Sequence, residues 1–247
     1  MGTNYIAPIW RMPKNANKDK LSNYSINFGG VSNYINCGGQ SLFNGLTAFS
    51  VSCWIKTDGI QQDYANIFSF QSSTSQYVKL AFYAGEKDRI RAVVRPGTLN
   101  PVYVKSSAGS IVDGEWVHIV VVGDANNLSN LNLYINGTLD NDVTQGNITT
   151  LVQSSDIYIG TDAGGLTTRE FKGEISQTCV FDYALTDGTG GTTNQIGYLY
   201  NLNNPMVPGA VNLTAPIAYW PLGDNSNPNA PGSFPNISVG ADSVFDL

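Results

Sequence analysis

The chain has 247 residues, of which 42% are hydrophobic and only 13% are charged. Its net charge is −6, and its 13 lysine and arginine residues form no cluster along the sequence, which argues against nucleic acid as a partner. No run of about 18 apolar residues occurs, and the N-terminal residues lack the pattern of a signal peptide, so neither membrane insertion nor secretion is expected.

Residues 1–22 contain two prolines and the polar stretch KNANKDK, a composition that cannot build its own core and predicts an extended arm. From residue 23 the pattern changes to short apolar-alternating runs separated by Gly, Asn and Asp. We therefore predict a sandwich domain over residues 23–203. The Pro/Asn-rich residues 204–247 are expected to complete either this sandwich or that of a neighbouring subunit.

Eleven short runs in the sandwich region have the strand pattern, without helical periodicity of comparable length. They are residues 24–28, 33–37, 49–56, 66–71, 77–84, 89–95, 102–106, 115–123, 131–137, 155–161 and 173–183. This pattern predicts an all-β fold, a jelly-roll sandwich of two antiparallel sheets. The run FSVSCWIK carries large apolar residues on both faces, so it is expected at the centre of a sheet. Asn136-Gly137 predicts a tight type I′ hairpin.

Five segments between residues 25 and 186 occur in an informative order: SINFGGVSNYINCG, FSVSCWIKTD, GEWVHIVVVGD, LNLYINGTL and FKGEISQTCVFDYALT. In this order they resemble the laminin-G-like, concanavalin A-like lectin/glucanase superfamily, and the resemblance implies the same jelly-roll sandwich. The chain departs from the family pattern at Gly29-Gly30 and at Ser176, where acidic residues are common. These departures leave fewer carboxylates for a family metal site.

The segment AYWPLGDNSNPN at residues 218–229 looks like the segment that normally begins such a domain, although here it lies near the end. The first and last strands of this fold tend to be neighbours. The segment is therefore expected to complete its own sandwich in permuted order or, alternatively, a neighbouring subunit by strand exchange.

Both tails of the chain look like those of structural proteins from marine tailed phages. This resemblance implies a virion head fibre, decoration or tail-fibre protein that is assembled in the host cytoplasm. The partners it implies are other virion proteins or copies of the chain itself, with a trimer as one arrangement, and a host-surface glycan.

Catalysis is not expected. His118 is the only histidine and lies inside a strand-like run, where a packing role is expected. Glu170 and Glu174 would lie about 13 Å apart on one strand face, too far for either glycosidase geometry. Cys37, Cys53 and Cys179 are too few and scattered for a disulfide framework and are expected as buried thiols, with one disulfide as the alternative.

Two loops offer the oxygen atoms that calcium requires. One contains Asp58, Asp63 and Asn66, and the other contains Asp124. The loop with Asp162 is a weaker candidate. The alternative is that these side chains only stabilise turns.

Carbohydrate binding requires an aromatic surface beside polar groups, and Tyr64, Tyr77 and Tyr83 are the candidates for it. The alternative is that these rings only cover sheet faces. Arg89, Arg91 and Arg95 lie at even offsets in one run, and they either contact an anionic ligand or form a solvated face.

The leading hypothesis from the sequence is a non-enzymatic virion structural or adhesion protein with a lectin-like binding module. The alternative is a calcium-dependent, carbohydrate-binding lectin that is secreted or lies at a cell surface.

Overall fold

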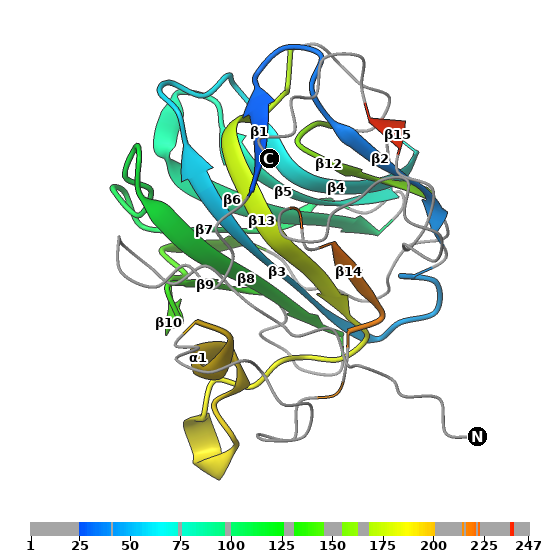
Figure 1. The fold of residues 1–247 in the computed structure, drawn as a ribbon. Coiled ribbons are helices and arrows are strands. Elements are labelled where there is room, and N and C mark those ends of the chain that lie inside the picture. The colour runs from blue at the N-terminus through cyan, green and yellow to red at the C-terminus, as the bar shows by residue number, and fades with distance from the viewer. Residues whose placement is uncertain are drawn as a thin grey trace, which may run out of the picture.

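The structure is a computed structural model that describes residues 25–40, 42–73, 76–96, 100–125, 131–145, 155–162, 168–200, 214, 216–220, 222 and 238–239. Over these residues the chain forms two antiparallel sheets that face each other, with one short helix, as the sequence predicts (Figure 1). The predicted arm at residues 1–22 and most of residues 204–247 lie outside the described residues, so the predicted domain boundaries stay a prediction.

The first sheet has seven strands in the order β1-β13-β3-β8-β9-β10, with β14 also paired to β13. The strands are β1 (Ile26–Gly29), β13 (Lys172–Phe181), β3 (Ala48–Thr57), β8 (Trp116–Asp124), β9 (Leu131–Ile135), β10 (Thr138–Leu139) and β14 (Ala218–Trp220). The run FSVSCWIK is β3, and its position between β13 and β8 confirms the prediction of a central strand. Asn136 and Gly137 both have positive φ, 51° and 79°, and close the predicted hairpin between β9 and β10.

The second sheet has eight strands in the order β11-β7-β6-β5-β4-β12-β2-β15. The strands are β11 (Val143–Gln145), β7 (Val102–Lys105), β6 (Glu86–Pro96), β5 (Gln76–Tyr83), β4 (Asn66–Ser73), β12 (Ser155–Ile159), β2 (Ile35–Gln40) and β15 (Ser238–Val239). Successive side chains on these strands point to opposite faces, so alternate residues enter the core between the sheets.

The core between the two sheets is rich in phenylalanine and aliphatic side chains. Its largest fully buried members include Phe28, Phe43, Phe49, Phe68, Phe70 and Phe82. Burial of this apolar surface is the main stabilising contribution to the sandwich.

A second buried cluster covers the outer face of the seven-stranded sheet. A 3-10 turn, η1 (Thr189–Gly191), leads to helix α1 (Gln195–Tyr200), whose Ile196 and Leu199 pack on this face against Trp54. The first sheet is therefore covered on both faces, whereas β5, β6 and β7 of the second sheet carry contacts between tyrosine rings and cationic side chains.

His118 and the three cysteines lie inside the protein. The His118 ring packs against the rings of Trp54 and Tyr200, whose centroids are 5.0 and 6.1 Å away. Its Nε2 atom lies 2.9 Å from the Oγ atom of Ser52. All three cysteines are buried free thiols, so the disulfide considered as an alternative is not formed.

The displaced segment AYW forms β14 and pairs with β13 of its own chain, with Thr178 opposite Trp220. The Trp220 side chain is buried in the core between the sheets. Among the described residues, no helix has the length and apolar character that a membrane span requires.

Candidate functional site

The four calcium candidates do not come together. Asp58 follows β3, whereas Asp124 pairs with Ala48 at the other end of that ten-residue strand, about 30 Å away. Asp58 and Asp63 are paired with lysines: Asp58 Oδ2 lies 3.7 Å from Lys172 Nζ, and Asp63 accepts from Lys87.

Asn66 is fully buried and donates its Nδ2 hydrogen to the Tyr64 carbonyl oxygen at 2.7 Å. Among the residues that the structure describes, no three His, Cys, Asp or Glu side chains are grouped as a metal site would require. Lysine side chains therefore balance the two aspartates in the loop that was expected to bind calcium.

Glu170 and Glu174 do not form a catalytic pair. The expectation that they share one strand is wrong, because β13 begins only at Lys172. Glu170 is fully buried, and its Oε1 atom accepts a hydrogen bond from the Ser32 amide at 2.7 Å. Glu174 instead accepts from Lys56 Nζ at 2.9 Å. A carboxyl group with the burial of Glu170 cannot reach a saccharide in solution.

The three candidate tyrosines all lie at the eight-stranded sheet. Tyr77 and Tyr83 are on β5, and Tyr64 lies two residues before the start of β4. The rings of Tyr64 and Tyr83 meet edge to face with centroids 5.6 Å apart. Tyr77 lies six residues from Tyr83 along β5, which is about 20 Å. The structure therefore joins Tyr64 to Tyr83 directly and reaches Tyr77 only through other side chains.

Those connecting side chains are cationic or acidic, and they link the tyrosines into one continuous set of contacts. We call this set the tyrosine–cation strip, and in order of contact it contains Tyr103, Arg91, Tyr83, Tyr64, Arg169, Asp162, Lys79 and Tyr77. The strip runs from β7 across β6 and β5, strands that lie side by side behind the first sheet in Figure 1.

Asp162 joins the two halves of the strip. Its carboxylate is only 2% exposed and binds Lys79 Nζ at 2.7 Å and Arg169 Nη1 at 2.6 Å. Burial lowers the pKa of Lys79 below its ordinary value, and the hydrogen bond to Asp162 acts in the opposite direction. The Lys79 ammonium also lies 4.5 Å from the Tyr77 ring centroid, and the Arg169 guanidinium lies 5.6 Å from that of Tyr64.

Arg91 lies between two tyrosine rings at the other end of the strip. Its guanidinium carbon is 4.1 Å from the ring centroid of Tyr103 and 4.8 Å from that of Tyr83. Lys105 on β7, opposite Arg91, places its Nζ atom 5.0 Å from the Tyr83 centroid. Two cations therefore share the Tyr83 ring.

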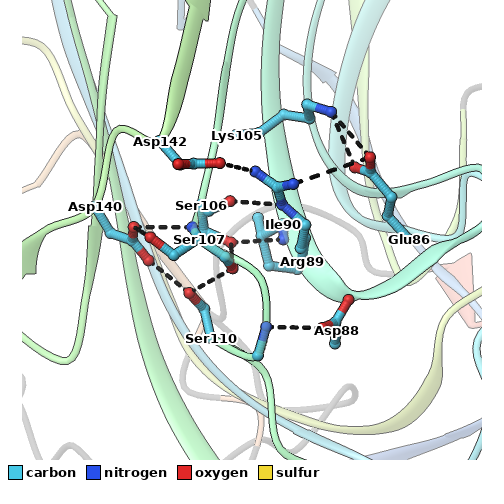
Figure 2. A network of polar contacts seen from close by, with 11 residues as sticks. Glu86, Asp88, Arg89, Ile90, Lys105, Ser106, Ser107, Ser110, Asp140 and Asp142 are labelled. Atoms are coloured by element: carbon cyan, nitrogen blue, oxygen red, sulfur yellow. Dashed lines mark hydrogen bonds and ion pairs between the residues drawn. The ribbon is translucent and has the colours of Figure 1, made fainter.

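A polar network, shown in Figure 2, fixes the β6 and β7 side of the strip. Glu86 binds Lys105 Nζ at 3.0 and 3.1 Å, and Arg89 donates to Asp142 and to the Ser106 carbonyl oxygen at 2.8 Å. The positive charge of Arg89 is thus neutralised within the protein by Asp142. Of the arginines that the sequence proposed for an anionic ligand, Arg89 is structural, whereas Arg91 belongs to the strip.

Sequence reasoning did not assign Lys79, Tyr103 or Arg169 to the site. Tyr77 and Lys79 are two residues apart on one strand, and alternate side chains of a strand share a face. This rule could have assigned Lys79 to the same face as Tyr77. Asp162 and Arg169 both lie between strands β12 and β13 in the sequence, and no periodicity in the sequence indicates that they reach Lys79.

Comparison with known proteins places the chain in a family. No curated protein sequence matches the chain. A native heptameric SAP-like pentraxin from Limulus polyphemus is similar in structure, with 16% identity and a TM-score of 0.54 over 87% of this chain and 94% of the pentraxin chain.

A protein from Bacteroides ovatus ATCC 8483, named as a candidate carbohydrate-binding protein, has 16% identity and a TM-score of 0.59, covering 92% of this chain and 61% of that one. At these identities the likenesses show the fold. The model of the concanavalin A-like lectin/glucanases superfamily matches residues 28–189, more than half of the sequence, and the chain belongs to this family.

Proposed function

We propose that the chain is a non-catalytic adhesion module that binds carbohydrate through the tyrosine–cation strip. The observation that carries this proposal is the continuous set of aromatic, cationic and acidic side chains on the eight-stranded sheet. The seven-stranded sheet, by contrast, is covered on both faces. Sugar rings present apolar C–H faces and hydroxyl groups, which fit aromatic rings and hydrogen-bonding side chains respectively.

Two further observations support the proposal. The burial of Glu170 removes the one acidic pair that was considered for glycosidic cleavage. The similar protein from Bacteroides ovatus is named as a candidate carbohydrate-binding protein. A binding role therefore fits both the chemistry of the site and the family.

A glycan array tests this function with the wild-type chain and two variants. Tyr83→Ala removes the ring that contacts Tyr64, Arg91 and Lys105, and it is expected to abolish binding. Tyr183→Ala is the matched control, because Tyr183 packs with the cluster on the outer face of the other sheet, and it is expected to bind as wild type does. Equal loss in both variants, or no bound glycan at all, contradicts the proposal.

The virion role is part of the same proposal and rests on the likeness of the two tails to those of marine phage structural proteins. An adhesion module of this kind would sit on the particle as a head fibre, decoration or tail-fibre component and contact a host-surface glycan. Mass spectrometry of purified particles, together with antibody labelling of intact ones, tests it. Absence of the chain from particles that were assembled in its presence contradicts the virion role but leaves carbohydrate binding intact.

Self-association is the other part of this proposal. Sedimentation of the full-length chain and of a chain lacking residues 1–22 measures it, with an oligomer expected for the full-length chain. A monomer in both samples contradicts an assembly role for the N-terminal arm.

A further inference from the structure

We propose that the strip selects anionic saccharides and that Arg91 binds their carboxylate or sulfate group. This inference rests on the proposed carbohydrate binding and adds the charge of the ligand.

Nearly every described cation is matched to a carboxylate within the protein. The side chains that form ion pairs are those of Lys56, Lys79, Lys87, Arg89, Lys105, Arg169 and Lys172. Arg91 forms no ion pair with any described carboxylate, although the chain has 19 acidic residues against 13 basic ones. No carboxylate in the described part of the chain balances the positive charge of Arg91, so an external anion can do so.

The contacts of Arg91 also hold its guanidinium in a defined place. Tyr103 and Tyr83 lie 4.1 and 4.8 Å from the guanidinium carbon, and the buried Nε atom has no hydrogen-bond partner among the described residues. A guanidinium placed against aromatic rings is weakly hydrated and has already lost part of its side-chain freedom. It therefore binds an oxyanion with less loss of water and of entropy than a free surface arginine does, and its planar fork matches a carboxylate or sulfate.

Arg91 is partly exposed to solvent, and neither of its strand partners carries a carboxylate. Its partner on β5 is Ala81, whose single methyl group places no long side chain beside the guanidinium. Its partner on β7 is Lys105, which Glu86 binds. An anion at Arg91 thus lies next to Tyr83, one of the two rings that contact the guanidinium.

A paired glycan array followed by titration calorimetry tests the inference. Each acidic glycan is matched to a neutral form: sialylated with desialylated, sulfated with unsulfated, and a uronate oligomer with its methyl ester. Wild type is expected to bind acidic members at least about tenfold more tightly than their neutral partners, with affinity that falls as sodium chloride rises. Arg91→Gln is expected to lower the affinity for the acidic member about 30-fold or more.

Two further variants separate charge from geometry and from general electrostatics. Arg91→Lys keeps the charge but lacks the planar fork, and an intermediate loss of about tenfold is expected. It also tests the inference if Arg91→Gln fails to fold, which thermal denaturation of each variant reveals. Lys172→Gln removes one positive charge outside the strip and is expected to bind as wild type does. Inorganic sulfate alone is expected to compete weakly, because it lacks the sugar ring.

The outcomes distinguish this inference from the proposed function. Equal binding of neutral and acidic partners leaves carbohydrate binding standing but overturns selection by charge. Acidic selectivity that survives both Arg91 variants and is lost in Tyr83→Ala overturns the role of Arg91. Absence of any glycan binding overturns the proposed function and this inference together.

Discussion

The Oδ1 atom of Asp162 lies 2.7 Å from the Nζ atom of Lys79, inside the strip and almost out of contact with water. The same carboxylate binds Arg169 at 2.6 Å, so one buried negative charge holds two positive ones in place. Lys79 in turn contacts Tyr77, and Arg169 contacts Tyr64. Asp162 therefore positions two aromatic contacts of the strip without itself being free for a ligand.

Asp162→Asn is expected to destabilise the protein by about 3 kcal/mol, because removal of the carboxylate charge leaves the largely buried Lys79 ammonium uncompensated. Chemical denaturation monitored by tryptophan fluorescence measures this change. The control is Asp63→Asn: Asp63 pairs with Lys87, but its side chain is 60% exposed, so the unfolding free energy should hardly change. If Asp162→Asn unfolds at the same denaturant concentration as wild type, the carboxylate does not organise the strip.

The stability of the protein is expected to fall between pH 6.5 and pH 5 because of His118. Burial lowers the pKa of this histidine to about 3, compared with about 6.5 in the unfolded chain. Between these two values the unfolded chain binds a proton that the folded chain does not, so stability is present above pH 6.5 and is lost as the pH falls. From pH 6.5 to pH 5 the loss from this residue is about 1.6 kcal/mol.

Thermal denaturation across this pH range measures the loss. His118 is the only histidine in the chain, so His118→Phe should flatten the dependence, even though it also removes the contact with Ser52. An unchanged pH slope in this variant would assign the effect to carboxyl groups instead.

Gly173→Ala is expected to cost about 3 kcal/mol or more of unfolding free energy. Gly173 has a φ of 134°, and a methyl group there would lie 2.2 Å from the backbone oxygen of Lys56 on β3. Gly109 is the control: its φ is 76°, with no atom within 4 Å of an added methyl group, so Gly109→Ala carries only the cost of its backbone conformation, about 1 kcal/mol. Equal losses of unfolding free energy in the two variants would show that the close contact with the Lys56 backbone oxygen does not determine the cost at Gly173.

Removal of divalent cations is expected to leave glycan binding and thermal stability unchanged. Lysine or arginine side chains already neutralise Asp58, Asp63 and Asp162, which the sequence offered as calcium ligands. Glycan binding with EDTA and with added calcium measures this directly. A chelator-sensitive signal would favour the alternative that the sequence left open, a calcium-dependent lectin.

The sequence by itself determined the fold class and several local features. FSVSCWIK predicted a strand covered on both faces, and it became the centre of the seven-stranded sheet because apolar side chains on both faces can be buried only there. Asn136-Gly137 predicted its hairpin because both residues accept positive φ. These features depend on residues that are close together in the sequence, so the sequence alone predicts them.

The tertiary structure alone decided which polar groups meet. Asp162 and Lys79 are far apart in the sequence, as are Tyr64 and Arg169, and their pairing depends on the order of the strands in the sheet. The start of β13 at Lys172 likewise separated Glu170 from Glu174. Hydrophobic alternation determines which face of a strand a residue occupies. Only the packed sheets determine the distance from that residue to a charge on another strand. That distance decides whether an aspartate binds a lysine or an external ligand.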